Sequence, residues 1–92
     1  EIELVLDEQP GVLESAVIGA PHPDFGESVI GILVADGSQP VDIEAIEADL
    51  GKTLARFKQP RKLILVESLP RNTMGKVQKN ILRDEFGSTF QG

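Results

Sequence analysis

The chain has 92 residues, which is enough for one small domain, and it has no cysteine, which excludes a disulfide framework, thiolate metal ligands and a thiol nucleophile. Its apolar runs are too short for a membrane span or a signal sequence, so we expect a cytoplasmic protein with no membrane partner. The net charge is −6, but the charges are unevenly distributed.

Residues 1–51 contain twelve acidic residues and no Lys or Arg, whereas residues 52–83 contain all nine Lys and Arg and one acidic residue. This asymmetry predicts either a basic surface that meets an anion or two halves that attract each other. Nucleic acid is not an expected partner, because the acidic half would repel a polyanion and no nucleic-acid motif is present.

The first half of the chain predicts one short element followed by a hairpin. Residues 2–6 are apolar in a pattern that suits either a helix or a strand, and Pro10 and Gly11 end the element. Residues 12–20 and 28–35 are apolar and β-branched, so we expect them to pair as antiparallel strands joined by a long loop over residues 21–26.

The second half predicts a helix, a third strand and a last helix. Asp42 is a favourable N-cap for a helix whose apolar face is formed by Ile43, Ile46, Leu50 and Leu54. Residues 63–66 are all apolar, so we expect a strand buried on both faces. A last helix, ended by Gly87 and followed by a frayed segment over residues 87–92, is predicted by the helical spacing of Val77, Ile81, Leu82 and Phe86.

The fold that we expect is therefore α+β, in the order α-β-β-α-β-α, with a small, three-stranded, mostly antiparallel sheet covered by helices. The most informative segment, residues 69–83, follows the third strand. Pro70 stiffens the exit from the strand, and Asn72, Thr73 and Gly75 favour a turn directly before Lys76. A lysine on such a loop is a compact cation with three donors, suited to bridging the oxygens of a phosphate and a carboxylate.

Residues 69–83 resemble the last motif of the adenylate-forming acyl-CoA synthetases, L-P-[RK]-T-x-x-G-K-[IV]-x-[RK]-x-x-L-R. The matching positions are Leu69, Pro70, Arg71, Gly75, Lys76, Val77, Lys79, Leu82 and Arg83. Asn72 stands where the family has threonine, which follows here as Thr73, and the spelling Asn-Thr-Met-Gly-Lys is similar to that of malonyl-CoA synthetases. Residues 57–61, 16–27 and 1–3 resemble three further motifs of the family, and this similarity favours a helix for the first element.

The resemblance implies that residues 1–92 are a single, small C-terminal domain of an acid-CoA ligase, hinged to a large N-terminal domain that the chain lacks. ATP and Mg²⁺ would be held mainly by that missing domain. The implied reaction makes an acyl-adenylate from ATP and a carboxylic acid, malonate or a similar short acid, and then an acyl-CoA thioester with CoA. Lys76 would be the catalytic residue of the first step, on an adenylate loop with Arg71, Thr73 and Gly75.

For the second step, the resemblance implies CoA contacts from Phe25, Phe57, Lys58 and Arg61. An aromatic ring can stack on adenine, and an arginine can bind a phosphate bidentately. The alternatives are that Phe25 is a hydrophobic plug of its turn and that Phe57 only ends a helix core. Gln59 stands where some relatives have a basic residue, which weakens the expected contact with the CoA phosphates.

Three further expectations concern Lys76, His22 and metals. Some relatives are switched off by acetylation of the loop lysine, so the resemblance implies a lysine acetyltransferase and a deacylase as partners acting on Lys76. His22 is the only histidine and is expected to be a structural turn residue, and no metal-ligand spacing is present. The isolated domain is expected to be inactive. The alternative function is a non-catalytic interaction module whose basic face docks an anion.

Overall fold

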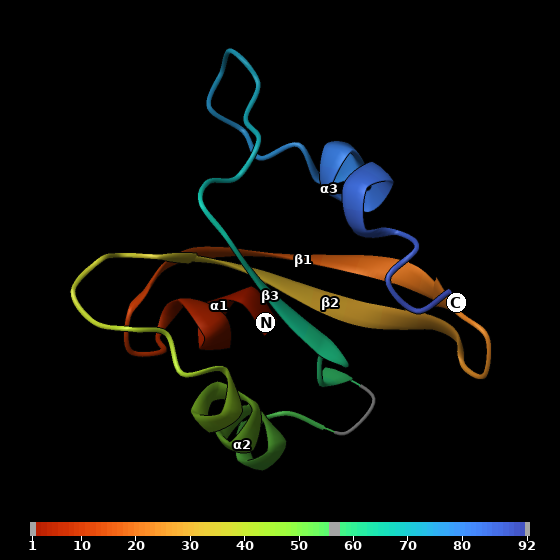
Figure 1. Ribbon diagram of the computed structural model, residues 1–92, viewed down its shortest axis with the longest axis horizontal. Helices are drawn as coiled ribbons and strands as arrows, with labels where there is room; N and C mark the ends of the chain where they lie inside the picture. The colour runs from red at the N-terminus through yellow and green to blue at the C-terminus, as the bar shows by residue number, and fades with distance from the viewer. Residues whose placement is uncertain (1, 56–57, 92) are drawn as a thin grey trace.

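The computed structural model describes residues 2–55 and 58–91, and all statements on structure refer to them. The predicted α+β fold and its α-β-β-α-β-α order are confirmed (Figure 1). The elements are α1 Ile2–Asp7, β1 Val12–His22, β2 Gly26–Ala35, α2 Ile43–Thr53, β3 Lys62–Val66 and α3 Lys79–Phe86.

The sheet is mixed, with strand order β1-β2-β3. β1 and β2 form the predicted antiparallel hairpin, but its loop is shorter than expected, because the strands continue until His22 pairs with Gly26. β2 and β3 are parallel, with Ile32 opposite Ile64. Parallel neighbours need a crossover connection, and α2 is part of that connection. The sheet therefore has one antiparallel and one parallel pair.

The helices cover both faces of the sheet (Figure 1). On one face, α1 and α2 enclose a buried cluster that consists of Leu6, Val12, Leu33, Ile46, Leu50, Leu54 and Leu63. On the other face, α3 and the segment before it enclose a second cluster that consists of Ala16, Ile18, Ala20, Ile30, Ile32, Val34, Leu69 and Leu82. Successive residues of the central strand β2 contribute to opposite clusters, as the period of two in a strand requires.

The expectation that the third strand is buried on both faces is wrong. Leu63 is buried, but Leu65 is 51% exposed. β3 has only β2 as a neighbour in the sheet, so it is an edge strand that α2 and α3 cover incompletely. A run of four apolar residues cannot distinguish a central strand from a half-covered edge strand.

Gly31 allows the first cluster to approach the centre of the sheet. A Cβ at Gly31 would lie 2.7 Å from Leu63 Cδ2 and 3.2 Å from Leu6 Cδ1, both shorter than ordinary contacts. The absent side chain is therefore what lets the side chains of Leu6 on α1 and Leu63 on β3 lie over β2 at this point.

The helix ends differ from the expectations in two places. The Asp42 cap is confirmed, since its side chain accepts a hydrogen bond from the Ala45 N–H at 3.1 Å. Val77 precedes α3 rather than belonging to it and forms an isolated antiparallel bridge with Arg71. Gly87 ends α3 as predicted, with a right-handed φ of −62°, but the expected fraying of the following segment is wrong for residues 87–91, because Phe90 packs against the second cluster.

Candidate functional site: the Lys76 loop and the Phe25–Arg61 pocket

Lys76 lies on a narrow loop that projects from the domain between β3 and α3 (Figure 1). The loop closes where Arg71 and Val77 form their bridge, and the Gln78 N–H donates to the Pro70 carbonyl at 2.8 Å just below it. Leu69 is buried in the second cluster and Val77 packs against it. The two ends of the loop are therefore fixed on the core while its tip extends into solvent.

Asn72 organises the inside of the loop. Its side-chain oxygen accepts hydrogen bonds from the N–H groups of Met74 at 2.9 Å and Lys76 at 3.0 Å. Its backbone N–H donates to the Lys76 carbonyl at 3.0 Å, and its carbonyl accepts from the Gly75 N–H at 3.0 Å. Asn72 thus takes part in four hydrogen bonds, and these define the path of the loop backbone from Asn72 to Lys76.

Gly75 makes the turn that this path requires. Its φ is +83°, in the region that glycine adopts without strain. The turn predicted directly before Lys76 is therefore confirmed. Met74 is 90% exposed, Thr73 and Lys76 are exposed, and the described residues include no ion-pair partner for the Lys76 ammonium. The loop presents its cation outward.

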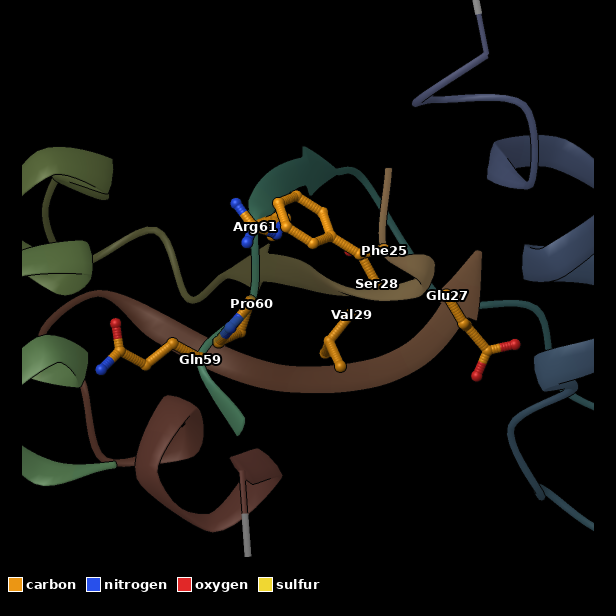
Figure 2. Close-up of a pocket in the computed structure, with 7 residues that line it drawn as sticks. All are labelled: Phe25, Glu27, Ser28, Val29, Gln59, Pro60 and Arg61. Atoms are coloured by element: carbon orange, nitrogen blue, oxygen red, sulfur yellow. The ribbon is translucent and has the colours of Figure 1, made fainter. Parts of the chain in front are cut away.

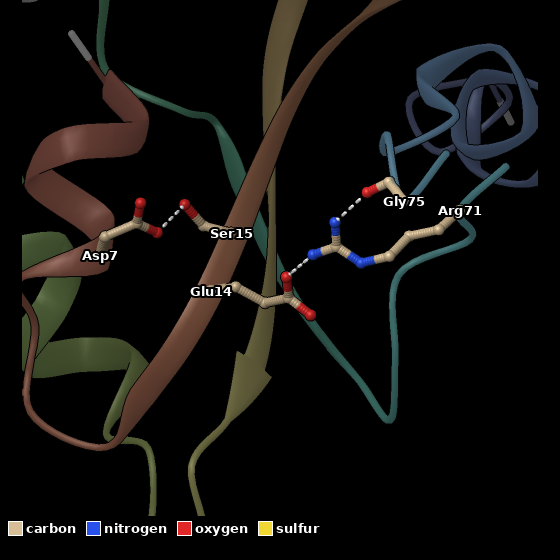
Figure 3. Close-up of polar contacts among 5 residues, drawn as sticks. All are labelled: Asp7, Glu14, Ser15, Arg71 and Gly75. Atoms are coloured by element: carbon tan, nitrogen blue, oxygen red, sulfur yellow. Dashed lines mark hydrogen bonds and ion pairs between the residues drawn. The ribbon is translucent and has the colours of Figure 1, made fainter. Parts of the chain in front are cut away.

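Arg71 connects the loop to the sheet (Figure 3). One terminal nitrogen of its guanidinium donates to the Gly75 carbonyl at 2.7 Å, and the other forms an ion pair with the Glu14 carboxylate on β1. Arg71 was predicted to belong to the adenylate loop, and its side chain contacts the loop itself and β1.

A second candidate region lies at the far end of the hairpin, where Phe25, residues 27–29 and residues 59–61 line a pocket of about 420 Å³ (Figure 2). The Arg61 guanidinium carbon lies 3.8 Å from the centroid of the Phe25 ring, and the Arg61 N–H donates to the Val29 carbonyl at 2.8 Å. The structure therefore brings together two predicted CoA contacts that are 36 positions apart in the sequence. Phe25 is 55% exposed, so much of its surface is accessible beside the turn.

The other two predicted CoA contacts are not in that pocket. Lys58 lines a different, smaller pocket of about 280 Å³ with Glu3, Val17 and Lys79. Phe57 lies outside the described residues. Gln59 lines the Phe25–Arg61 pocket, although its side-chain amide donates to the Leu54 carbonyl at 3.0 Å.

Comparison with protein families identifies this chain. The AMP-binding enzyme C-terminal domain matches residues 1–76, the segment that ends at the loop lysine. The chain belongs to this family.

Curated relatives of this AMP-binding enzyme C-terminal domain are ligases. The chain is 43% identical, over 97% of its length, to the long-chain-fatty-acid–CoA ligase FadD13 of Mycobacterium tuberculosis, of which it covers 18%. It is 39% identical, over its whole length, to the 3-methylmercaptopropionyl-CoA ligase of Ruegeria lacuscaerulensis, of which it covers 17%. The chain thus spans less than a fifth of the relatives that it matches.

Solved structures agree with this assignment. The domain superimposes on the crystal structure of ATP-bound MatB from Rhodopseudomonas palustris with a TM-score of 0.94 and 49% identity, covering 98% of this chain and 18% of that one. It also matches the amide bond synthetase McbA from Marinactinospora thermotolerans, with a TM-score of 0.85, 35% identity and coverage of 92% and 17%. The fold of this domain is therefore shared with both of these solved structures.

His22 has the contacts of a structural turn residue in this family member. Its Nδ1 accepts a hydrogen bond from the Asp24 N–H at 3.0 Å. Its ring lies 4.6 Å from the Phe25 ring and 5.1 Å from the Phe90 ring, measured between centroids. These contacts tie the hairpin turn to the segment after α3.

Glu3 joins three elements of the domain. Its carboxylate accepts a hydrogen bond from the Val17 N–H at 2.8 Å and forms an ion pair with Lys79 at 2.8 Å. Partial burial opposes ionisation, but the hydrogen bonds from Lys79 and Val17 together with the Lys79 charge hold the pKa of Glu3 below its ordinary value. Glu3 thereby links α1, β1 and the first residue of α3.

Sequence reasoning identified Asn72 as a turn residue but not its hydrogen bonds to Met74 and Lys76, and it missed Glu14. The tendency of asparagine to bond backbone groups two residues further on could have indicated the bond to Met74. No local signal indicates Glu14, because 57 positions separate it from Arg71. No group of three or more potential metal ligands occurs in residues 2–55 and 58–91, and no helix there is long and apolar enough to cross a membrane.

Proposed function

We propose that this chain is the mobile C-terminal domain of an AMP-forming acid-CoA ligase and that Lys76 acts in its adenylation step. In that step, a carboxylate oxygen attacks the α-phosphorus of ATP, an acyl-adenylate forms and pyrophosphate leaves. The CoA thiol then attacks the acyl carbon, the thioester forms and AMP leaves. The family assignment and the curated CoA ligases among the relatives support this proposal.

The role of Lys76 follows from charge. Both the carboxylate and the α-phosphate are anionic, so their approach is opposed by repulsion. An ammonium that contacts both oxygens relieves the repulsion and stabilises the crowded transition state, which is electrostatic and orienting work rather than proton transfer. Removal of one such group typically lowers the rate by about 10²- to 10³-fold.

The observation that carries the proposal is the way the loop presents Lys76. The Asn72 side chain and the positive φ of Gly75 hold the backbone in a defined turn, while the ammonium of the next residue is exposed. A lysine held in this way can enter a nucleotide site on another domain without rearrangement of its own fold. The small domain would thus complete a site that the large N-terminal domain forms around ATP and the acid.

The Phe25–Arg61 pocket is the part of this domain best suited to the CoA nucleotide. The exposed Phe25 ring offers a face to adenine, and the Arg61 guanidinium beside it can bind a phosphate. The pocket is lined by residues next to the turn between β1 and β2, and this turn lies apart from the loop between β3 and α3 that carries Lys76 (Figure 1). The domain would therefore turn between the two steps and present one region at a time to the large domain.

Malonate or a similar short acid is the proposed substrate, supported by the similarity of residues 72–76 to the malonyl-CoA synthetase spelling. The described residues do not provide a Mg²⁺ site of their own, so we assign any Mg²⁺ that accompanies ATP to the large domain.

We further propose that acetylation of Lys76 by a lysine acetyltransferase, reversed by a deacylase, regulates adenylation. The exposure of Lys76 supports this, because the side chain is reachable without unfolding.

The test measures the two half-reactions separately in the full-length enzyme. Lys76→Ala should lower the rate of acyl-adenylate formation from ATP and the acid by about 10²-fold or more, whereas thioester formation from supplied acyl-adenylate should stay near the wild-type rate. Lys52→Ala, an exposed lysine on α2 across the sheet, is the matched control and should leave both rates unchanged. Full adenylation by Lys76→Ala would overturn the proposal and favour a non-catalytic interaction module.

A further inference from the structure

The guanidinium of Arg71 is engaged on two sides. It donates to the Gly75 carbonyl at 2.7 Å, one residue before Lys76, and it forms an ion pair with Glu14 (Figure 3). The two terminal nitrogens serve different partners, which the forked geometry of the guanidinium allows. An arginine that is already engaged in this way is a poor candidate for a direct contact with ATP.

The loop has many internal hydrogen bonds, but few contacts attach its tip to the rest of the domain. The bonds of Asn72 and the bridge between Arg71 and Val77 all lie within the loop. Among the described residues, the only polar side-chain contact recorded between residues 71–77 and the sheet is the one between Arg71 and Glu14. The internal bonds determine the shape of the loop, and the contact between Arg71 and Glu14 determines its orientation relative to the sheet.

Glu14 is placed for this contact by the local structure of β1. The register shifts between Val12 and Glu14, which marks a β-bulge. Beyond the bulge, Glu14 lies in phase with Ala16 and Ile18, which are buried on the face that α3 covers. The bulge therefore directs a carboxylate toward the face from which the Lys76 loop projects, as bulges commonly do when they redirect a side chain.

We propose that Glu14 is a positioning residue for adenylation, which acts through Arg71 and Gly75 to direct Lys76. The inference rests on the function proposed for Lys76. Glu14 itself contacts neither ATP nor the acid in this mechanism. Its carboxylate holds the guanidinium, the guanidinium holds the Gly75 carbonyl, and the backbone at Gly75 sets the direction of the next side chain. Because the interaction is needed only when Lys76 meets the transition state, its loss should lower kcat more than it raises KM.

The test uses the full-length enzyme and the Glu14→Ala variant, with ATP, the acid and CoA. We expect the kcat of adenylation to fall by about tenfold, less than the roughly 10²-fold loss that a 1 Å misplacement can cause. The KM for ATP should change by less than about twofold, and thioester formation from supplied acyl-adenylate should be unchanged. Glu67→Ala removes an exposed acidic residue shortly before the loop and should leave both half-reactions at the wild-type rate.

A double-mutant cycle distinguishes positioning from a general structural role. If Glu14 acts through Arg71, Glu14→Ala should cause no further loss in an Arg71→Ala background. Arg71→Lys, which keeps the charge but cannot serve both partners with a planar fork, should recover only part of the activity lost in Arg71→Ala. A thermal unfolding midpoint close to that of the wild type would show that Glu14→Ala has folded.

The outcomes separate this inference from the function on which it rests. Normal adenylation by Glu14→Ala, together with a large loss in Lys76→Ala, would overturn the positioning role and leave the role of Lys76 intact. Equal losses in both half-reactions, or additive losses in the double variant, would also overturn it. Normal adenylation by Lys76→Ala would overturn the proposed function itself.

Discussion

The side-chain oxygen of Asn72 accepts a hydrogen bond from the Lys76 N–H at 3.0 Å, so the proposed catalytic lysine is placed by a residue four positions before it. The same oxygen also accepts from the Met74 N–H. By contrast, exposed Thr73, which the sequence resemblance implied as a member of the adenylate loop, has no recorded side-chain hydrogen bond within the described residues. The difference between these neighbouring residues gives a direct test of the loop.

In the full-length enzyme, Asn72→Ala should lower adenylation by about tenfold, because the loop loses both side-chain hydrogen bonds that define its turn, and a small misplacement of a reacting group is costly. Thr73→Ala should retain the wild-type rate. The adenylation rate of Asn72→Thr should lie between those of Asn72→Ala and Thr73→Ala, because a threonine hydroxyl makes the same kind of local hydrogen bond more weakly. Pyrophosphate exchange measures all three, and equal rates for Asn72→Ala and Thr73→Ala would contradict this account.

Gly75→Ala should destabilise the domain by roughly 1 kcal/mol, because an L-residue is strained at a φ of +83° even though no atom lies within 4 Å of the added Cβ. Gly37→Ala is a matched control, since Gly37 has the same φ and equally open surroundings on a turn remote from Lys76. Urea unfolding should give similar losses of stability for the two variants. Only Gly75→Ala should also lose adenylation, and a comparable loss in Gly37→Ala would show that strain alone causes it.

The ion pair of Glu3 with Lys79 predicts a loss of stability in acid. The folded-state pKa of Glu3 lies below its ordinary value of 4.5, so the unfolded chain binds the proton more readily. The stabilisation is therefore present above pH 4.5 and is lost as the pH falls through the lower, folded-state pKa. Unfolding free energies of the wild type and Glu3→Gln, measured with urea between pH 7 and pH 3, should differ at neutral pH and converge in acid. A difference independent of pH would contradict this prediction.

Acetylation of Lys76 should lower the adenylation rate in proportion to the fraction of enzyme that is acetylated. The modification removes the charge of the lysine and adds bulk where it contacts the phosphate. The full-length enzyme would be treated with acetyl-CoA and a lysine acetyltransferase, and the modified sites mapped by mass spectrometry. Treatment with a deacylase should restore the rate. Full adenylation by enzyme stoichiometrically acetylated at Lys76 would contradict both the regulation and the catalytic role.

Local patterns were sufficient to predict the hairpin, the Asp42 cap and the glycine turn before Lys76, since each depends on residues close in the sequence. The parallel pairing of β2 with β3 was not predicted, because it depends on the crossover through α2 rather than on the strands themselves. The exposure of Leu65 likewise depends on which elements cover an edge strand. The resemblance indicated both Phe25 and Arg61, but only the fold shows that their side chains meet.

The central strand β2 separates the two buried clusters, so α2 and the Lys76 loop are supported by different sets of core residues. Apolar substitutions on α2 act on the cluster around Leu33, whereas the anchors of the Lys76 loop, Leu69 and Val77, belong to the cluster on the opposite face. The exposed surface of α2 is thus insulated from the proposed chemistry by a layer of backbone. Such an arrangement leaves that surface free to diverge, so chimeras that exchange α2 between relatives should keep their adenylation rates while their surfaces change.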